Sequence, residues 1–361
     1  MIDMERLDAD LDLALVDELR VQVTPPTVVR GPLAAEAVAP QPGPAPSGGA
    51  ALRPRPSPRP SSPRPSSPLA PADPVWDDFD IEAHARAVVD LVALGKLAEA
   101  DLHIVAHAEL AHASGRPDHR GDASGWAVMR ALLDGRALAA RAGIDEPAAR
   151  ERTWVQRFAL ALAWGDEHER YDVLDHCRER AYCQGDIAWQ GRLTLLLAVL
   201  GRNSEATREL DTTIDAVLRA STCDAGWLDL ATDLAEAAAI LGDPDRCHLA
   251  GRGLDRAKTP IAVAGPAWVC KGSVARYQAL VTAAAGEAEP SDRYFHSAAE
   301  IHRRLGAEVL LARTLGEWGR SLAGRDPSRG ARLTRESSEL SHQLGLSPGA
   351  PAIDALAARA S

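Results

Sequence analysis

The amino-acid sequence predicts an all-α protein: an α-solenoid of about seven irregular helical hairpins, preceded by a short helix and a disordered Pro-rich linker. Of its 361 residues, 46% are hydrophobic but only 4% are aromatic. Such a core must consist mainly of Ala and Leu, which favours helices over strands. From residue 75 onward the segments are amphipathic with helical periodicity, and we find no convincing strand.

Seven glycines mark the predicted hairpins. Each follows an apolar helix end and precedes a polar turn and another helix, with spacings from 30 to 44 residues: Gly95, Gly135, Gly165, Gly201, Gly242, Gly286 and Gly324. A glycine in this place ends a helix in the left-handed conformation. The spacing predicts tetratricopeptide-like (TPR-like) helical hairpins of irregular length over residues 76–345.

Two different segments precede the repeats, and a tail at residues 346–361 follows them. Residues 1–24 predict an acidic amphipathic helix with one apolar stripe, formed by Leu7, Leu11, Leu15 and Leu19. It is a candidate docking helix for another chain or for this protein's own repeats, the alternative being a frayed tail. Residues 25–75 hold 16 of the 25 prolines and predict a disordered extended spacer, or a ligand for a proline-binding module.

Charge and cysteine usage narrow the class of protein. The net charge of -11 and the lack of a basic patch argue against direct nucleic-acid binding. The longest apolar run, residues 193–200, is too short for a membrane span, and no export signal is visible. Five cysteines without CxxC spacing indicate reduced thiols in a cytoplasmic protein. The preference for Arg over Lys is typical of a high-GC bacterium such as an actinobacterium.

Three stretches carry a resemblance to a known family. They are "GSVARYQALVTAAAG" (272–286), "SAAEIHRRLGAEVLLARTLGEWGRSL" (297–322) and the segment from residue 152 to 202. Together they resemble the TPR-like helical region of large ATP-binding LuxR-type, maltose-activator-like transcriptional regulators and of related multidomain nucleotide cyclases. The resemblance covers about residues 82–345. It implies the sensor or docking part of such a regulator.

The departures from that family limit what the resemblance implies. No GxxxxGK[ST] phosphate-binding loop is present, and no helix-turn-helix follows the last repeat. We therefore expect a non-catalytic protein-interaction or regulatory scaffold with a protein or peptide partner. One alternative is a module that senses a small-molecule effector and acts with a separate ATPase or DNA-binding partner. Another is a truncated remnant of a full regulator.

The chemistry-bearing residues predict no enzyme, metal or cofactor. Glu99, His103 and His107 are spaced i, i+4, i+8 near His112, and two such histidines can share a zinc ion. The HExxH order is absent and a third ligand must come from elsewhere, so a solvated helix face is the favoured interpretation. No GxSxG nucleophile elbow is present.

A ladder of aromatic and guanidinium side chains is the candidate binding groove. Three Trp/Arg pairs stand three or four residues apart on the first helices of successive hairpins: Trp126 with Arg130, Trp154 with Arg157, and Trp189 with Arg192. On the concave face of a solenoid they would suit an acidic peptide or a small anion. The alternative places the indoles in the core between repeats, with the arginines extending past them.

The charged stretch 295–322 predicts an ordinary outer helix face. Its apolar stripe is assigned to Ile301 and Leu305, which leaves Glu300, His302, Arg303 and Arg304 in solvent. Arg313 and Glu317 share a face, although Arg before Glu is the less favourable order for an i, i+4 pair.

Overall fold

The computed structural model describes residues 78–144 and 151–346, with side chains from residue 80, and all of them belong to one compact unit. This part of the chain contains fourteen α-helices, which confirms a mostly helical fold. The proposed linker and, apart from Leu346, the proposed tail lie outside the described residues. So do residues 1–24 with Leu7, Leu11, Leu15 and Leu19.

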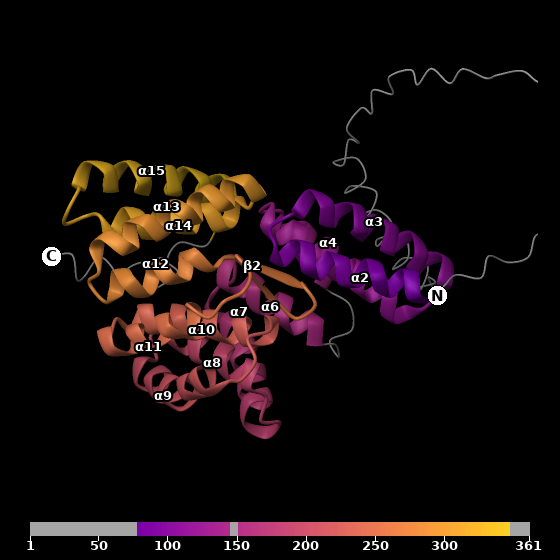
Figure 1. The fold of residues 1–361 in the computed structure, drawn as a ribbon, viewed down its shortest axis with the longest axis horizontal. Coiled ribbons are helices and arrows are strands. Elements are labelled where there is room, and N and C mark those ends of the chain that lie inside the picture. The colour runs from indigo at the N-terminus through magenta and orange to yellow at the C-terminus, as the bar shows by residue number, and fades with distance from the viewer. Residues whose placement is uncertain (1–77, 145–150, 347–361) are drawn as a thin grey trace, which may run out of the picture. The chain divides into compact units, whose positions relative to one another are not determined.

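The helices form seven consecutive pairs whose members pack on each other (Figure 1). The pairs are α2 (Asp78–Ala93) with α3 (Leu97–Ser114), α4 (Pro117–Leu133) with α5 (Ala137–Ile144), α6 (Glu151–Ala163) with α7 (Glu167–Arg178), α8 (Ile187–Val199) with α9 (Asn203–Arg219), α10 (Ala225–Leu241) with α11 (Pro244–Leu254), α12 (Val274–Ala284) with α13 (Ala288–Leu305), and α14 (Glu308–Ser321) with α15 (Pro327–Gln343). A π-helical turn, η1 (Glu179–Cys183), continues α7. Each pair also contacts the next pair along the chain.

Five of the seven glycines end their helices as predicted. Their φ angles lie between 70° and 86°: Gly95, Gly135, Gly201, Gly242 and Gly286. The prediction is wrong for Gly165 and Gly324, which do not have a positive φ. At the first of these, α7 begins instead with a capping box, in which Asp166 accepts from the Glu169 N–H and Glu169 accepts from the Asp166 N–H.

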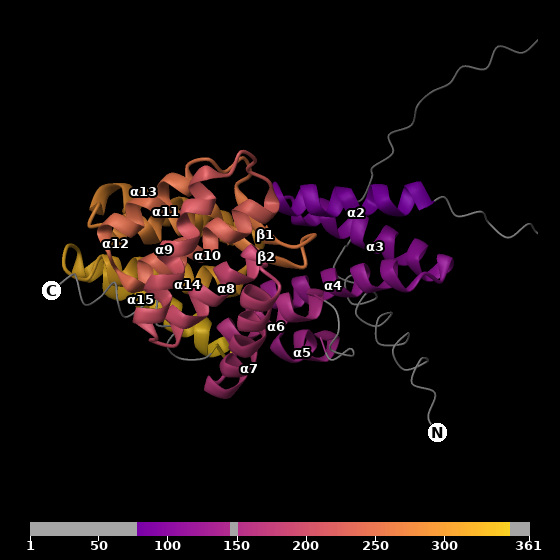
Figure 2. The ribbon, with the colours of Figure 1, turned by 90° about the horizontal axis from the view of Figure 1, so that it is seen from below.

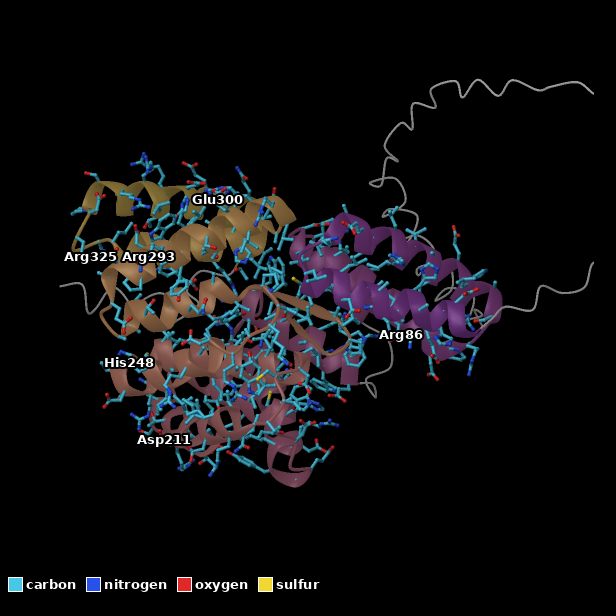
Figure 3. All side chains as sticks on the ribbon, viewed as in Figure 1. Arg86, Asp211, His248, Arg293, Glu300 and Arg325 are labelled. Atoms are coloured by element: carbon cyan, nitrogen blue, oxygen red, sulfur yellow. The ribbon has the colours of Figure 1, made fainter. Side chains whose placement is uncertain are left out.

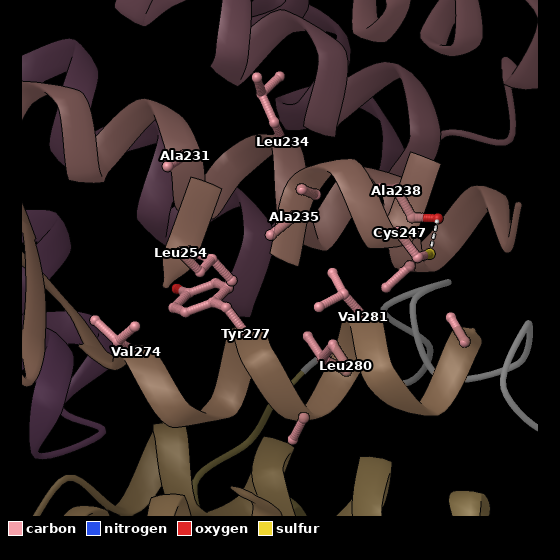
Figure 4. Close-up of a cluster of buried hydrophobic side chains, with 14 of the residues drawn as sticks. Ala231, Leu234, Ala235, Ala238, Cys247, Leu254, Val274, Tyr277, Leu280 and Val281 are labelled. Carbon is pink, nitrogen blue, oxygen red and sulfur yellow. Dashed lines mark hydrogen bonds between the residues drawn. The ribbon is translucent and has the colours of Figure 1, made fainter. Parts of the chain in front are cut away.

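Small and branched aliphatic side chains fill the core between α10 and α12 (Figure 4). Ala231, Leu234, Ala235 and Ala238 of α10 belong to the same buried cluster as the apolar residues of α12. The Cys247 thiol donates to the Ala238 carbonyl oxygen over 3.4 Å. Alanine lets the helix axes approach closely, so an Ala- and Leu-rich sequence suffices for this packing.

A β-hairpin interrupts the helices, and the expectation of no strands is wrong there. Strands β1 (Ile261–Ala264) and β2 (Val269–Ser273) pair antiparallel between α11 and α12. The hairpin packs against α10 and also against α2 and α4, far earlier in the chain (Figure 2). All four residues of β1 are buried. Helices distant in sequence therefore meet at this hairpin.

A β-bulge in the hairpin sets the direction of one side chain. Ala262 pairs with Gly272 and Val263 with Cys270, so Lys271 is the extra residue of β2. A bulge locally re-aims side chains, and Lys271 reaches the acidic residues of α10. Gly272 supplies the positive φ of 88° that the backbone adopts next to this residue.

Replacing Gly272 with alanine is expected to destabilise the protein by at least about 2 kcal/mol. A Cβ there would lie 2.6 Å from His302 Nε2 and 2.7 Å from Leu310 Cδ1, besides requiring a positive φ. The matched control is Gly306→Ala, whose φ is 63° but whose Cβ meets nothing within 4 Å. It should lose only about 1 kcal/mol in urea unfolding, and equal losses in the two variants would contradict the described packing.

Among the described helices, none combines the length and apolar character that crossing a bilayer requires.

Candidate functional site

Three acidic residues stand on one face of the buried helix α10. Asp229, Asp233 and Glu236 are 3%, 1% and 7% exposed, and their i, i+4, i+7 spacing aligns them along the helix. Helices α8, α9, α11 and α12 and strand β1 all pack around α10, so these carboxylates are shielded from bulk water. Buried carboxylates need cationic partners.

The first two carboxylates are paired by cations from other elements. Arg192 of α8 lies 2.5 Å from Asp229 Oδ2. Lys271 of the bulge lies 2.8 Å from Asp229 Oδ1 and 2.6 Å from Asp233 Oδ1. Two polar atoms of these residues, Asp233 Oδ2 and Arg192 Nη1, are buried without a hydrogen-bond partner in the described part of the chain.

The third carboxylate of α10, Glu236, shares the guanidinium of Arg276 with a fourth carboxylate, Glu317. The two terminal nitrogens of Arg276, which is 1% exposed, donate to Glu236 over 3.0 Å each. The same guanidinium donates to Glu317 of α14 over 2.9 and 2.5 Å. The seven residues Arg192, Asp229, Asp233, Glu236, Lys271, Arg276 and Glu317 together form what we call the buried ion-pair chain.

Burial and pairing shift the pKa values of these acids in opposite directions. Burial raises the pKa of Asp233 to about 6, against the opposing charge of Lys271. Burial also acts on Glu236, but the charge and hydrogen bonds of Arg276 outweigh it and hold that pKa at about 2. Such opposed shifts in one place are typical of binding and catalytic sites as well as of structural ion pairs.

The ion-pair chain borders a pocket with apolar walls, which we call the central pocket. Its volume is about 80 Å³. Its apolar lining includes Leu132 of α4, Leu195 of α8, Leu310 of α14 and, from α6, Val155, Phe158 and Leu162. An apolar pocket with a few convergent polar groups is the usual form of a small-molecule site.

Arg313 of α14 lines the central pocket without a carboxylate partner. Its guanidinium donates to the Leu162 carbonyl oxygen over 2.7 Å. Within the described residues no carboxylate oxygen forms a salt bridge with it, and the adjacent Glu317 is bound by Arg276 instead. Burial lowers the pKa of Arg313. The pocket therefore offers a cation to whatever enters it.

The charges of stretch 295–322 divide between two environments. Glu300, Arg303 and Arg304 are exposed as predicted, and Glu300 lies at the outside of its helix (Figure 3). His302 contradicts the prediction because it is fully buried. Its Nε2 accepts from the Ser273 N–H over 2.9 Å and its Nδ1 lies 3.0 Å from the Thr314 hydroxyl. These bonds connect β2, α13 and α14.

Two indoles of the candidate groove are inside the protein. Trp126 is 1% exposed and donates to the Pro266 carbonyl oxygen of the hairpin over 2.8 Å. Trp189 is fully buried, with the Arg192 guanidinium 4.7 Å from its ring centroid. Arg130 pairs with Asp101 over 3.1 Å. Neither of these two indoles faces a groove, whereas Arg192 lines an internal pocket and Arg130 lines a different pocket at the surface.

The remaining pair of the candidate groove lines a separate pocket. Trp154 stacks on His176 at 4.0 Å, and Arg157 lies 5.1 Å from the indole centroid. Both line a pocket of about 250 Å³ between α5, α6 and α7. The structure thus keeps two of the Trp/Arg pairs in contact, Trp154 with Arg157 and Trp189 with Arg192, and it does not bring the three pairs onto one surface.

The histidines of α3 also have different surroundings. His103 Nδ1 lies 2.8 Å from His84 Nδ1, and His112 is exposed. His107 is fully buried, so the interpretation of a solvated helix face is wrong for this residue. With His119 and Asp122 of α4 it forms a group of potential metal ligands.

Comparison with known proteins adds no relative: no family model matches the sequence, and no curated protein is significantly similar to it.

Proposed function

We propose that this chain is a non-catalytic regulatory scaffold whose central pocket binds a small effector with an apolar body and one carboxylate. In this proposal the seven helix pairs are TPR-like repeats of an α-solenoid, as in the sensor part of LuxR-type regulators. A separate ATPase or DNA-binding protein would be the partner that responds. The observation that carries the proposal is Arg313, a guanidinium in an apolar-walled pocket that forms no salt bridge with a carboxylate of the described residues, although Glu236 and Glu317 lie near enough for their charges to act on it.

The size and polarity of the pocket narrow the effector class. Its 80 Å³ is roughly half of the cavity volume that accommodates the six carbons of benzene, so only about three to four heavy atoms fit. A short-chain carboxylate matches this space: its carboxylate would pair with Arg313 and its alkyl chain would contact Leu162 and Phe158. A hydroxyl on that chain would find an acceptor in the unpartnered Asp233 Oδ2.

The groups that face the pocket favour binding over catalysis. Cys270 is its only thiol among the described lining residues, and burial raises the pKa of that thiol to about 11. A protonated thiol is a weak nucleophile. Lys271 and Arg276 are held by carboxylates, so neither is free to transfer a proton.

The position of the pocket suits a regulatory role. Its lining comes from α4, α6, α8, α10, α12, α14 and the hairpin. An effector would therefore contact every helix pair from the second to the seventh, and it would favour the arrangement in which those pairs are close.

The experiment is a thermal-unfolding titration with acetate and propionate, the carboxylates nearest to the pocket in size, and with the matched amides. We expect the carboxylates to raise the Tm of the wild type, by a stability gain of about 2.7 kcal/mol at a hundredfold excess over Kd. The amides should give no shift. Arg313→Gln should lose the effect, whereas Arg325→Gln, at an exposed arginine (Figure 3), should keep it. A flat response of the wild type, or equal shifts with carboxylates and amides, would refute the proposal.

A further inference from the structure

A buried histidine without hydrogen bonds lies near the start of the described chain. His107 of α3 has no exposed surface, and neither Nδ1 nor Nε2 has a partner in the described residues. Its ring packs edge-on against Trp126 at 4.9 Å and against His119 at 5.8 Å. Leaving two buried polar atoms without hydrogen bonds is unfavourable. A bound ligand or ion that contacts the ring would remove part of this cost.

Two further ligand-type side chains face this histidine from the next helix. His119 and Asp122 stand i, i+3 on α4 and therefore share a face. The connection from α3 to α4 is short: Gly115 ends α3 with a φ of 68°, and Pro117 is the first residue of α4. The turn brings one ligand atom of each of His107, His119 and Asp122 within 4.8 Å of the other two.

We propose that His107, His119 and Asp122 bind a divalent transition-metal ion, with Zn²⁺ the best match. Two imidazole nitrogens and one carboxylate oxygen are the donor set that Zn²⁺ accepts in three-ligand sites with an open fourth position. Mg²⁺ and Ca²⁺ prefer oxygen ligands throughout. Bonds of about 2.0 Å in tetrahedral geometry place the ligand atoms roughly 3.3 Å apart. The three ligand atoms now lie within 4.8 Å of one another, and small side-chain rotations would bring them to that spacing.

The surroundings of the three ligands are compatible with a cation. Asp118, on the first turn of α4, adds a second negative charge near Asp122. Two groups already act on Asp122: the Trp268 side chain acts as a hydrogen-bond donor to it, and the positive charge of Arg152 lies near it. The Arg152 guanidinium also donates to the Gly121 carbonyl oxygen. A bound ion would satisfy one of the two unpartnered ring nitrogens of His107 and would cross-link α3 to α4, at the junction between the first two helix pairs.

The test is a Zn²⁺ titration of the untagged full chain by calorimetry, repeated with Co²⁺ and followed by visible absorption. We expect one equivalent to bind, with the d–d spectrum of a nitrogen- and oxygen-ligated site. His119 and Asp122 are half-buried, and His119→Ala and Asp122→Asn should each weaken Zn²⁺ binding by about a hundredfold or more. Replacing a residue that only hydrogen-bonds to a metal ligand typically weakens binding by about 10- to 100-fold. Circular dichroism would show that both variants keep their helices.

Two histidine variants serve as controls on the same helix. His112→Ala changes an exposed residue five positions after His107 and should leave the affinity within about twofold. His103→Ala should do the same, since His103 is paired with His84 instead. The proposal is overturned if the wild type binds no Zn²⁺, if His119→Ala and Asp122→Asn bind as tightly as the wild type, or if His103→Ala abolishes binding.

Discussion

Replacing Arg276 with methionine is expected to lower the free energy of unfolding by about 3–5 kcal/mol, the usual result of removing one partner from a buried ion pair. The residue fills its site between α10 and α14, and Glu236 and Glu317 would stay behind, 7% and 1% exposed, without a cation. Urea unfolding at pH 7, followed by helical circular dichroism, measures the loss.

The matched control is Arg293→Met, which removes an exposed i, i+4 pair with Glu289 and should change stability by no more than about 0.5 kcal/mol. Neutralising both acids as well, in Arg276→Met with Glu236→Gln and Glu317→Gln, should restore much of the loss because no unpaired charge remains. Equal effects of Arg276→Met and Arg293→Met would contradict the described ion-pair chain.

Acid is expected to destabilise the protein through His302. Burial, and then the nearby charge of Arg276, lower the pKa of this imidazole to about 3. The folded state therefore holds it neutral while the unfolded chain takes up a proton below pH 6.5. The contribution of neutral His302 to the free energy of unfolding is fully present above pH 6.5 and is lost as the pH falls towards 3. Between pH 6.5 and 4 the loss of stability amounts to about 3 kcal/mol.

The comparison that isolates this histidine is His302→Gln, whose amide can still accept from the Ser273 N–H and donate to Thr314. We expect the variant to be less stable than the wild type at pH 8 and to lose less stability between pH 6.5 and 4. His168→Gln, at a side chain that is 85% exposed, should follow the wild-type curve. If the wild type and His302→Gln show parallel pH dependence, His302 is not held neutral.

The arrangement of helices could be predicted because its signals are local. A glycine after an apolar helix end is recognised from adjacent residues alone, and this pattern located the turns of all seven helix pairs. It did so even at Gly165, which does not adopt the predicted left-handed conformation. The hairpin carries no comparable signal. The run "IAVA" is short and buried on both faces, so it lacks the alternation that identifies a strand. Only the Gly265–Pro266 dipeptide marked its turn.

The candidate site depends on contacts between distant residues, which periodicity does not specify. One signal was present: Asp229, Asp233 and Glu236 repeat at i, i+4, i+7 within an otherwise apolar helix, which indicates a buried polar stripe. Their partners come from α8, β2 and α12 and could not be inferred. His302 shows a related failure, since the buried stripe of α13 passes through Phe295, His302 and Leu305 and only partly includes Ile301.

The hairpin has a consequence for how the chain folds. A simple repeat array can fold pair by pair from either end, because each unit contacts only its neighbours. Here β1 contacts α2 and β2 contacts α4, across well over a hundred residues, which raises the contact order and slows folding. During synthesis the first helix pairs leave the ribosome long before their hairpin partner, so they complete their packing only after residues 261–273 have emerged.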